Sequence, residues 1–199
     1  NSTLVGMPQL TILVWAKNNK TFIDATGGEL IFSKAGSGTP DSYIIYWAMD
    51  EAYGCQIDTG GGLKTHEPGD KMQDTEWHQY GLHYNGATLS VIFDGVIKSG
   101  GTAVTGLIAS NAGHSLGIGG EGTNASWDGL IDHAVMWGRA LTSNEVALLY
   151  REPFCMFEKD NIALMAVEAP APGGGQVIMI TSLPLLFIGL YLWKYKEAA

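Results

Sequence analysis

Short runs of apolar or alternating residues recur along the chain between turn signals rich in Gly, Asn, Asp and Pro. In an extended strand, alternate side chains point to opposite faces. Many short strands at this spacing are typical of an all-β sandwich. The runs predicted to be strands are 10–16, 30–33, 43–49, 54–58, 77–84, 89–93, 96–98, 116–119 and 129–137.

Two dipeptides predict tight hairpins in the middle of the chain. Asn85-Gly86 and Asp94-Gly95 each separate two strand-like runs, and both pairs are typical of type I′ turns, which need positive φ at both central residues. Residues 77–98 are therefore predicted to form a three-stranded meander. In its first strand the even-numbered residues 80–84 are aromatic or aliphatic, while the odd-numbered residues 79–83 are Gln, Gly and His. We expect one dry face and one wetter face.

One short helix is predicted after the last strand. Thr142 and Glu145 have the spacing of a capping box, in which each side chain accepts a hydrogen bond from the other residue's backbone amide. Apolar residues follow at i, i+3 and i+4 from Val146, which gives one apolar stripe. Pro153 ends the helix.

The composition changes after residue 157, so residues 1–157 are predicted to form one domain. Residues 158–176 are a Pro/Gly-rich linker, and the next seventeen residues, 177–193, carry no charge. About 17 to 25 helical residues span a bilayer. Lys194 and Lys196 follow in the short basic end, 194–199, which favours a cytoplasmic C-terminus. We expect a transmembrane helix at 177–193; the alternatives are a segment buried between neighbouring subunits of an assembly and a processed sorting signal.

The charge and cysteine content exclude some classes of protein. A net charge of −9 argues against a nucleic-acid partner, because phosphate binding needs clustered Lys and Arg. Cys55 and Cys155 are too few for a disulfide framework and lack the spacing of a metal knuckle. Whether they pair stays open. The chain starts at Asn1, so either a leader has been removed or the sequence is a fragment.

Two stretches resemble the laminin G-like domains of the concanavalin A-like lectin/glucanase superfamily. Residues 76–96, EWHQYGLHYNGATLSVIFDGV, resemble the family's Trp-His strand, Tyr-x-Gly turn and Asp-Gly hairpin. Residues 127–150, WDGLIDHAVMWGRALTSNEVALLY, resemble its Gly-x-Ile-Asp strand and capped helix, and are also similar to the end of pentraxin domains. The likeness implies a jelly-roll sandwich of two antiparallel sheets.

The resemblance departs from the family at the N-terminus. The family's usual opening strand, which lies ahead of the strand at residues 10–17, is missing or degenerate in this chain. Its absence would leave an exposed edge strand, which another segment or a second copy of the chain would have to cover. We therefore consider a homo-oligomer formed through an uncovered edge.

The superfamily includes glycoside hydrolases, in which a pair of acidic residues performs the cleavage. Retaining cleavage needs two carboxyl groups about 5 Å apart, and the Glu-x-Asp-x-x-Glu signature of the glucanase relatives is absent from this sequence. Asp50 and Glu51 are adjacent and would point to opposite faces of a strand. Asp128 and Asp132 are separated by four residues across a turn and a strand. We expect no catalysis.

Family members commonly bind glycans or proteins, some of them through calcium held in loops at one rim. Calcium takes about six to eight oxygen ligands. In the loop 119–129, Glu121, Asn124 and Asp128 are the candidate calcium ligands, against the alternative of an ordinary Gly-rich connection. His78 and His83 lack a carboxylate at ligand spacing and are expected to be polar residues on a half-exposed strand.

Two further sets of residues have candidate roles. Exposed aromatic rings stack on sugars, and the loop-proximal candidates are Tyr43, Trp47 and Tyr53, although core packing explains them equally well. Asp132 matches the Asp of the family's Ile-Asp motif. We expect it to be structural, accepting hydrogen bonds from the backbone or from Arg139.

The sequence thus predicts a non-catalytic, lectin-like adhesion module that binds a glycan or an extracellular protein. The membrane helix would display it on the extracellular face. The alternative is a structural subunit of a virion or an extracellular filament. Ligand identity and calcium dependence stay open at this stage.

Overall fold

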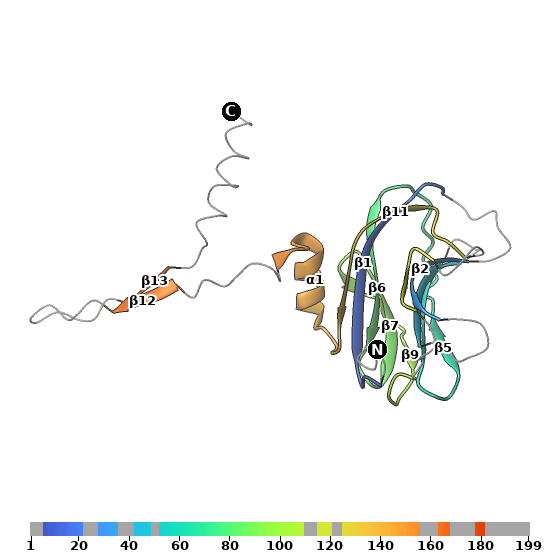
Figure 1. Cartoon of the computed structure of the whole chain (residues 1–199), viewed down its shortest axis with the longest axis horizontal. Coiled ribbons are helices and arrows are strands. Elements are labelled where there is room, and N and C mark those ends of the chain that lie inside the picture. Colours follow the sequence, from blue (N-terminus) through green and yellow to red (C-terminus); the bar gives the residue numbers. More distant parts are fainter. Residues whose placement is uncertain are drawn as a thin grey trace, which may run out of the picture. The chain divides into compact units, whose positions relative to one another are not determined.

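The structure, a computed structural model, describes residues 6–21, 28–35, 42–48, 52–109, 115–120, 125–155, 163–167 and 178–181. The chain divides into two compact units, Asn1–Glu152 and Pro153–Ala199. The first unit is a two-sheet antiparallel sandwich with one short helix (Figure 1). This confirms the predicted all-β fold class.

Six strands form the first sheet and five form the second. The first sheet has the order β11-β1-β6-β7-β8, and β9 also pairs with β7. Its strands are β1 (Leu10–Asn18), β6 (Trp77–Tyr84), β7 (Thr88–Phe93), β8 (Val96–Ile97), β9 (Thr102–Ala103) and β11 (Gly129–Trp137). The second sheet has the order β10-β2-β3-β4-β5. Its strands are β2 (Glu29–Lys34), β3 (Tyr43–Trp47), β4 (Tyr53–Asp58), β5 (Leu63–His66) and β10 (Gly117–Ile118).

The core lies between the two sheets and follows the alternation expected of strands. In β1 and β6 the even-numbered apolar residues face inward and are almost fully buried. The second sheet contributes large aromatic and aliphatic side chains from β2, β3 and β4 to the same cluster. The largest fully buried side chains include Trp47, Tyr43, Tyr53, Tyr80, Tyr84, Ile12 and Leu82. The dry face predicted for β6 is thus confirmed.

The two predicted hairpin turns differ from each other. Asp94 and Gly95 have φ of 45° and 77°, which confirms a type I′ turn between β7 and β8. At the other hairpin Gly86 has φ of 90°, but Asp94 is the only non-glycine residue with positive φ among the described residues. The Asn85 side chain instead accepts hydrogen bonds from the amides of Ala87 and Thr88. The type I′ prediction is wrong there, because the Asn carboxamide organises a longer loop.

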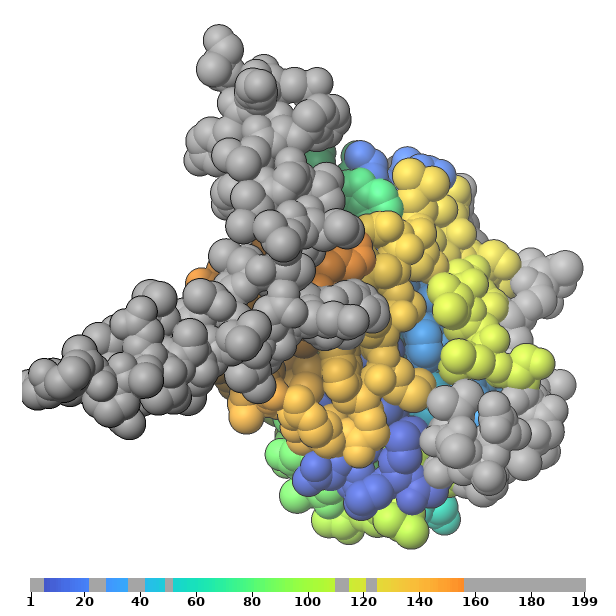
Figure 2. All heavy atoms as spheres, turned by 60° about the vertical axis from the view of Figure 1, so that its left-hand side comes forward, coloured from blue at the N-terminus to red at the C-terminus, as the bar shows by residue number. Residues whose placement is uncertain are grey.

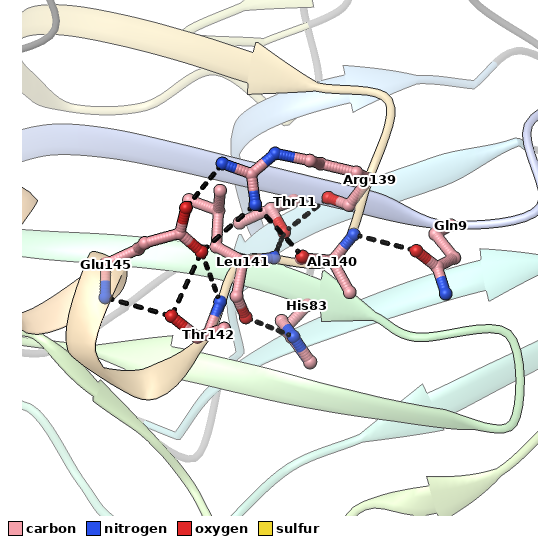
Figure 3. A network of polar contacts seen from close by, with 8 residues as sticks. All are labelled: Gln9, Thr11, His83, Arg139, Ala140, Leu141, Thr142 and Glu145. Atoms are coloured by element: carbon pink, nitrogen blue, oxygen red, sulfur yellow. Dashed lines mark hydrogen bonds and ion pairs between the residues drawn. The ribbon is translucent and has the colours of Figure 1, made fainter.

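The outer face of β6 is not wet, contrary to the sequence prediction. Gln79 is 1% exposed and His83 is 8% exposed. The segment between β11 and the helix lies across this face and is held by polar contacts (Figure 3). The Thr11 hydroxyl donates to the carbonyl of Arg139, and a ring nitrogen of His83 lies 3.0 Å from the carbonyl oxygen of Leu141. The segment after β11 therefore forms a third layer over the sheet.

Helix α1 (Ser143–Arg151) confirms the predicted capping box. Thr142 is the N-cap, and both reciprocal hydrogen bonds with Glu145 are present. Val146 and Leu149 are buried beneath the helix. The ring of Tyr150 stacks on Trp15 of β1, with centroids 5.3 Å apart and planes 7° apart. These contacts fix α1 on the outer face of the first sheet.

The edge of the first sheet is β11 and not β1, which lies between β11 and β6. Strand β1 is thus paired on both sides, and the predicted homo-oligomer through an uncovered edge strand stays a prediction. Strand β11 itself carries a β-bulge, because its pairing with β1 passes from Val14–Ala134 to Ala16–Ile131. Bulges on edge strands hinder pairing with another chain. The bulge lies on this edge strand, which runs yellow to orange through the middle of the view in Figure 2.

The second unit contains an antiparallel pair of strands, β12 (Ala163–Val167) and β13 (Ile178–Thr181). Residues 178–181 are therefore extended, while the remainder of 177–193 lies outside the described residues. The predicted transmembrane helix stays a prediction. In the ranges that the structure describes, no helix is both long and apolar enough to cross a bilayer. Cys55 is buried in the core of the first unit, and whether it pairs with Cys155 of the second unit stays open.

Candidate functional site

Polar and aromatic side chains gather at one end of the sandwich, where β7 ends and β4 and β6 begin. We call this the rim cluster. Register places these strand ends together, because Tyr80 of β6 pairs with Phe93 of β7, and Tyr53 of β4 stacks on Phe93. The loop 67–76 between β5 and β6 adds two carboxylates. The cluster consists of Tyr53, Asp70, Asp74, His78, Phe93, Asp94 and Lys98.

Aromatic rings form the inner layer of the rim cluster. The Phe93 ring stacks on Tyr53, with centroids 4.4 Å apart, and on the imidazole of His78 at 4.9 Å. Tyr80 meets Phe93 edge-on at 5.5 Å. Tyr53 and Tyr80 are buried, whereas Phe93 and His78 are half-buried. The aromatic layer therefore continues from the core to the surface.

His78 connects two carboxylates in the outer layer. Its Nδ1 lies 2.7 Å from Oδ2 of Asp94, and its Nε2 lies 2.9 Å from Oδ1 of Asp74. The hydrogen bond to Asp94 is the main cause that raises the pKa of His78 to about 8, and burial acts against it. The amide of Glu76 is the main cause that holds the pKa of Asp74 below its usual value. At neutral pH a protonated His78 thus bridges the side chains of Asp74 and Asp94.

Asp70 forms a second polar group beside the same aromatic layer. Its Oδ2 accepts hydrogen bonds from the Lys98 ammonium at 2.5 Å and from the Tyr53 hydroxyl at 3.1 Å. The Lys98 hydrogen bond is the main cause that lowers the pKa of Asp70. Burial, followed by the Asp70 contact, raises the pKa of Tyr53. The Lys98 ammonium also lies 5.6 Å from the centroid of Phe93, within cation–π range.

Local backbone geometry fixes Asp94 in this arrangement. The type I′ turn brings its carboxylate back onto β6, where Oδ1 accepts a hydrogen bond of 2.9 Å from the amide of Gln79. The amide of Asp94 in turn donates to the carbonyl of Gln79 at 3.0 Å. A residue of the turn and a residue of the strand thus hold each other by two hydrogen bonds.

Two carboxylates of the rim cluster are open to solvent and can accept hydrogen bonds. The side chains of Asp70 and Asp74 are 53% and 52% exposed, so their oxygens are accessible to a hydroxyl donor. A general acid in glycoside cleavage needs a raised pKa, so that it holds a proton near neutral pH. Asp70 and Asp74 have lowered pKa values. Both carboxylates are therefore suited to accept hydrogen bonds from a ligand.

The aromatic residues predicted to stack on a sugar are enclosed in the core. Tyr43 and Trp47 are 0% exposed and Tyr53 is 2% exposed, so none presents a ring face to a ligand. The predicted stacking role is wrong for all three, because their odd-numbered strand positions face inward. Tyr53 still reaches the candidate site through its hydroxyl group. Trp47 instead packs edge-on against Trp127, with centroids 6.2 Å apart.

The predicted calcium ligands are only partly visible in the structure. Glu121 and Asn124 lie outside the described residues. Asp128 is described, and both of its carboxylate oxygens already face nitrogens, Oδ1 that of Asn19 and Oδ2 that of Lys20. The described side chains contain no group of three or more His, Cys, Asp or Glu that could hold a metal ion. Asp128 is thus held by protein donors, and the calcium site of the loop 119–129 stays a prediction.

The structural roles predicted near the end of the domain are confirmed only in part. Arg139 binds both carboxylate oxygens of Glu145, at 2.6 and 3.0 Å, and does not bind Asp132. The Arg139 contact is the main cause that lowers the pKa of Glu145 to about 2. Asp132 lies in the bulge, with an oxygen 3.2 Å from Nδ1 of the neighbouring His133. Of the two donors expected for Asp132, the backbone or Arg139, the second instead binds Glu145.

Sequence reasoning missed the rim cluster. His78 was expected to be an ordinary polar residue on a half-exposed strand, because no carboxylate lies at metal-ligand spacing from it. Its two partners are four and sixteen residues away, in a loop and in a turn. The Asp94-Gly95 turn signal could have located one of them, because a type I′ turn returns its residues to the preceding strand. Asp70 and Asp74 give no periodic signal.

Comparisons with known proteins agree with this architecture. The family model of the concanavalin A-like lectin/glucanases superfamily matches residues 2–147. No curated protein matches the chain.

Several solved structures share the fold. A heptameric SAP-like pentraxin from Limulus polyphemus is 20% identical, covering 72% of this chain and 70% of that one, with a TM-score of 0.54. Domain 4 of AbnA, an extracellular arabinanase from Geobacillus stearothermophilus solved with arabinotriose, is 18% identical, covering 74% and 68%, with a TM-score of 0.56. The binding domain of Paraclostridial Mosquitocidal Protein 1 is 14% identical, covering 81% and 41%, with a TM-score of 0.56. At these identities the likeness shows the fold alone, whereas the match over residues 2–147 shows the family. The chain belongs to the concanavalin A-like lectin/glucanase superfamily.

Proposed function

We propose that this protein is a non-catalytic carbohydrate-binding module and that the rim cluster holds the sugar. The observation that carries the proposal is the convergence of accessible carboxylates and an ammonium group on a half-buried aromatic layer. Ligand sites combine apolar or aromatic surface with a few well-placed polar groups. Asp70 and Asp74 accept hydrogen bonds from sugar hydroxyl groups, and Lys98 donates one.

The pKa values of the rim support a binding role over a hydrolytic one. Asp70 and Asp74 stay ionised at neutral pH, because hydrogen-bond donors lower their pKa values. An ionised carboxylate is a strong hydrogen-bond acceptor and gives no proton to a leaving group. The arabinotriose bound to the arabinanase domain of similar fold supports an oligosaccharide as the ligand class. A protein ligand at the same rim is the alternative.

The test is a glycan array with the full-length protein, followed by titration of the best ligand. Asp70→Asn and Asp74→Asn each remove the charge of one acceptor, and we expect each to weaken binding about ten-fold, the effect of one charge-assisted hydrogen bond. Asp132→Asn is the matched control, because Asp132 is a similarly exposed carboxylate outside the cluster. Its affinity stays unchanged. If all three variants bind the glycan as tightly as the natural protein does, the binding site lies elsewhere.

Display on a membrane surface is the second part of the proposal. It is supported by the uncharged run 177–193 followed directly by Lys194 and Lys196. We expect the full-length protein to sediment with membranes and to resist extraction from them by carbonate. A chain that ends at residue 176 should stay in the supernatant. Ordered particles formed by the full-length chain without lipid would favour the structural-subunit alternative.

A further inference from the structure

A lysine ammonium group lies beside Asp128, the one predicted calcium ligand that the structure describes. The Lys20 Nζ lies 2.6 Å from Oε1 of Glu29 and 3.5 Å from Oδ2 of Asp128. The other oxygens of the two carboxylates face neutral donors. Oε2 of Glu29 accepts from the amide of Asp128 at 3.1 Å, and Oδ1 of Asp128 accepts from the side-chain amide of Asn19 at 3.2 Å. Each of the four carboxylate oxygens therefore faces a nitrogen.

These contacts connect three chain segments from both sheets. Lys20 follows β1 and Asp128 precedes β11, both in the first sheet, while Glu29 begins β2 in the second sheet. Additional hydrogen bonds hold the segments, since the amide of Asn19 donates to the carbonyl of Asp128 and the amide of Leu30 donates to that of Ala125. The ammonium group thus closes this end of the sandwich, as a bound cation would.

The Glu29 carboxylate is buried and therefore needs the positive charge of the Lys20 ammonium group. The Glu29 side chain is only 6% exposed, whereas that of Lys20 is 23% exposed. A carboxylate removed from water needs a compensating charge, and the Lys20 ammonium is near enough to supply it. A calcium ion would need about six to eight oxygens around it, and at this position it would lie against the ammonium group.

We infer that Lys20 is a built-in replacement for a divalent cation at this end of the sandwich, so that the fold does not depend on calcium. Loss of the ammonium group converts Glu29 and Asp128 into a weak divalent-cation site. The inference is independent of the proposed glycan binding, because its readout is the thermal stability of the protein.

The first experiment compares the melting temperature of the full-length protein in calcium and in EDTA. We expect the two values to agree within about 1 °C, because a shift of that size corresponds to less than half a kcal/mol for a chain of this length. A rise of several degrees on addition of calcium would overturn the inference, since it would reveal a native calcium site that stabilises the domain.

The second experiment uses Lys20→Met, which keeps the length and apolar stem of the side chain and removes its charge. We expect the melting temperature in EDTA to fall by about 4 °C, because a mostly buried carboxylate loses its partner. Calcium at about 10 mM restores most of the loss, since this concentration is about ten times the Kd of about 1 mM that is typical of weak calcium sites. A variant that folds only in calcium meets the same expectation.

Two control variants make the result specific. Lys20→Arg keeps the positive charge, so its melting temperature does not respond to calcium. In the double variant Lys20→Met/Asp128→Asn one carboxylate is lost, and calcium no longer restores stability. If Lys20→Met is as stable as the natural protein, or if calcium has no effect on it, the ammonium group does not act as a replacement cation and the inference is wrong.

Discussion

Nδ1 of His78 lies 2.7 Å from Oδ2 of Asp94, and this contact joins the start of β6 to the turn after β7. The other ring nitrogen reaches Asp74, so a single imidazole also holds the loop 67–76 against the sheet. The protonation state of His78 therefore controls contacts on both sides of the rim cluster. It gives the rim a pH dependence near neutrality.

The free energy of unfolding should decrease as pH rises from 6.5 to 8, because His78 loses its proton in this interval. Its folded-state pKa of about 8 lies above the unfolded value of 6.5, so the native state binds more protons in this interval. The stabilisation is fully present below pH 6.5 and is lost as pH rises through 8. We expect a loss of about 1 kcal/mol, less than the full shift implies, because Asp74 is exposed and solvent screens the pair. Urea unfolding at a series of pH values measures this loss, and we expect His78→Gln not to show it. If the unfolding free energy depends equally on pH in both proteins, His78 is not the origin of the loss.

Acid should destabilise the domain through His66. For this residue the free energy of unfolding falls as pH falls, whereas for His78 it falls as pH rises. Burial is the main cause that lowers the pKa of this buried imidazole, whose Nδ1 accepts a hydrogen bond of 3.0 Å from the amide of Val91. Protonation of Nδ1 removes that acceptor, so stability present above pH 6.5 is lost as pH falls towards the lowered folded-state value. His66→Asn keeps an acceptor that does not titrate. Its unfolding free energy should fall less between pH 7 and pH 5 than that of the natural protein, and an equally steep fall would contradict this role.

Gly81 should be irreplaceable in the centre of β6. A Cβ atom at this position would lie 2.5 Å from the carbonyl oxygen of Ile12 and 2.8 Å from a methyl group of Leu13. Because the first neighbour is backbone of the adjacent strand, it cannot move away, and Gly81→Ala should destabilise the protein by about 3 kcal/mol. Gly61→Ala is the matched control, with no atom within 4 Å of the new Cβ. Chemical denaturation measures both, and similar values for the two variants would contradict the β1–β6 register.

The capping box should contribute measurably to the docking of α1. Thr142→Ala removes the hydroxyl group that accepts from the amide of Glu145, and we expect a loss of about 1 kcal/mol. Ser143→Ala removes a hydroxyl group one residue later, within the helix, and should change stability by less than about 0.5 kcal/mol. Thermal unfolding of the two variants decides the point. A larger loss for Ser143→Ala would mean that the helix begins one residue later.

The parts of the fold that could be predicted from the sequence are those set by local patterns. The Asp94-Gly95 turn and the Thr142–Glu145 box depend on residues near one another in the chain, and the alternation in β6 needs only the strand period. The face of β6 that carries His83 was predicted incorrectly, because its cover comes from Leu141, fifty-eight residues away. No local pattern reports such a contact.

The candidate site was largely beyond sequence reasoning for the same reason. Asp74, His78 and Asp94 belong to a loop, a strand and a turn that meet only when the β6–β7 hairpin has formed. The position of Lys20 between Glu29 and Asp128 likewise depends on the pairing of β1 with β11 and on the approach of β2 from the other sheet. The family resemblance suggested calcium beside Asp128, whereas the compensating charge there comes from the chain itself.

The most direct test of glycan binding at the rim is a titration of the histidine imidazole resonances of the full-length protein by NMR. It is carried out with and without the oligosaccharide that binds best on the array. Binding at the rim cluster changes the chemical shifts and the pKa of His78, which contacts Asp74 and Asp94, and leaves His66 and His83 unchanged. Saturable binding with an unchanged His78, or cleavage of the oligosaccharide during the titration, would contradict a non-catalytic sugar site at this rim.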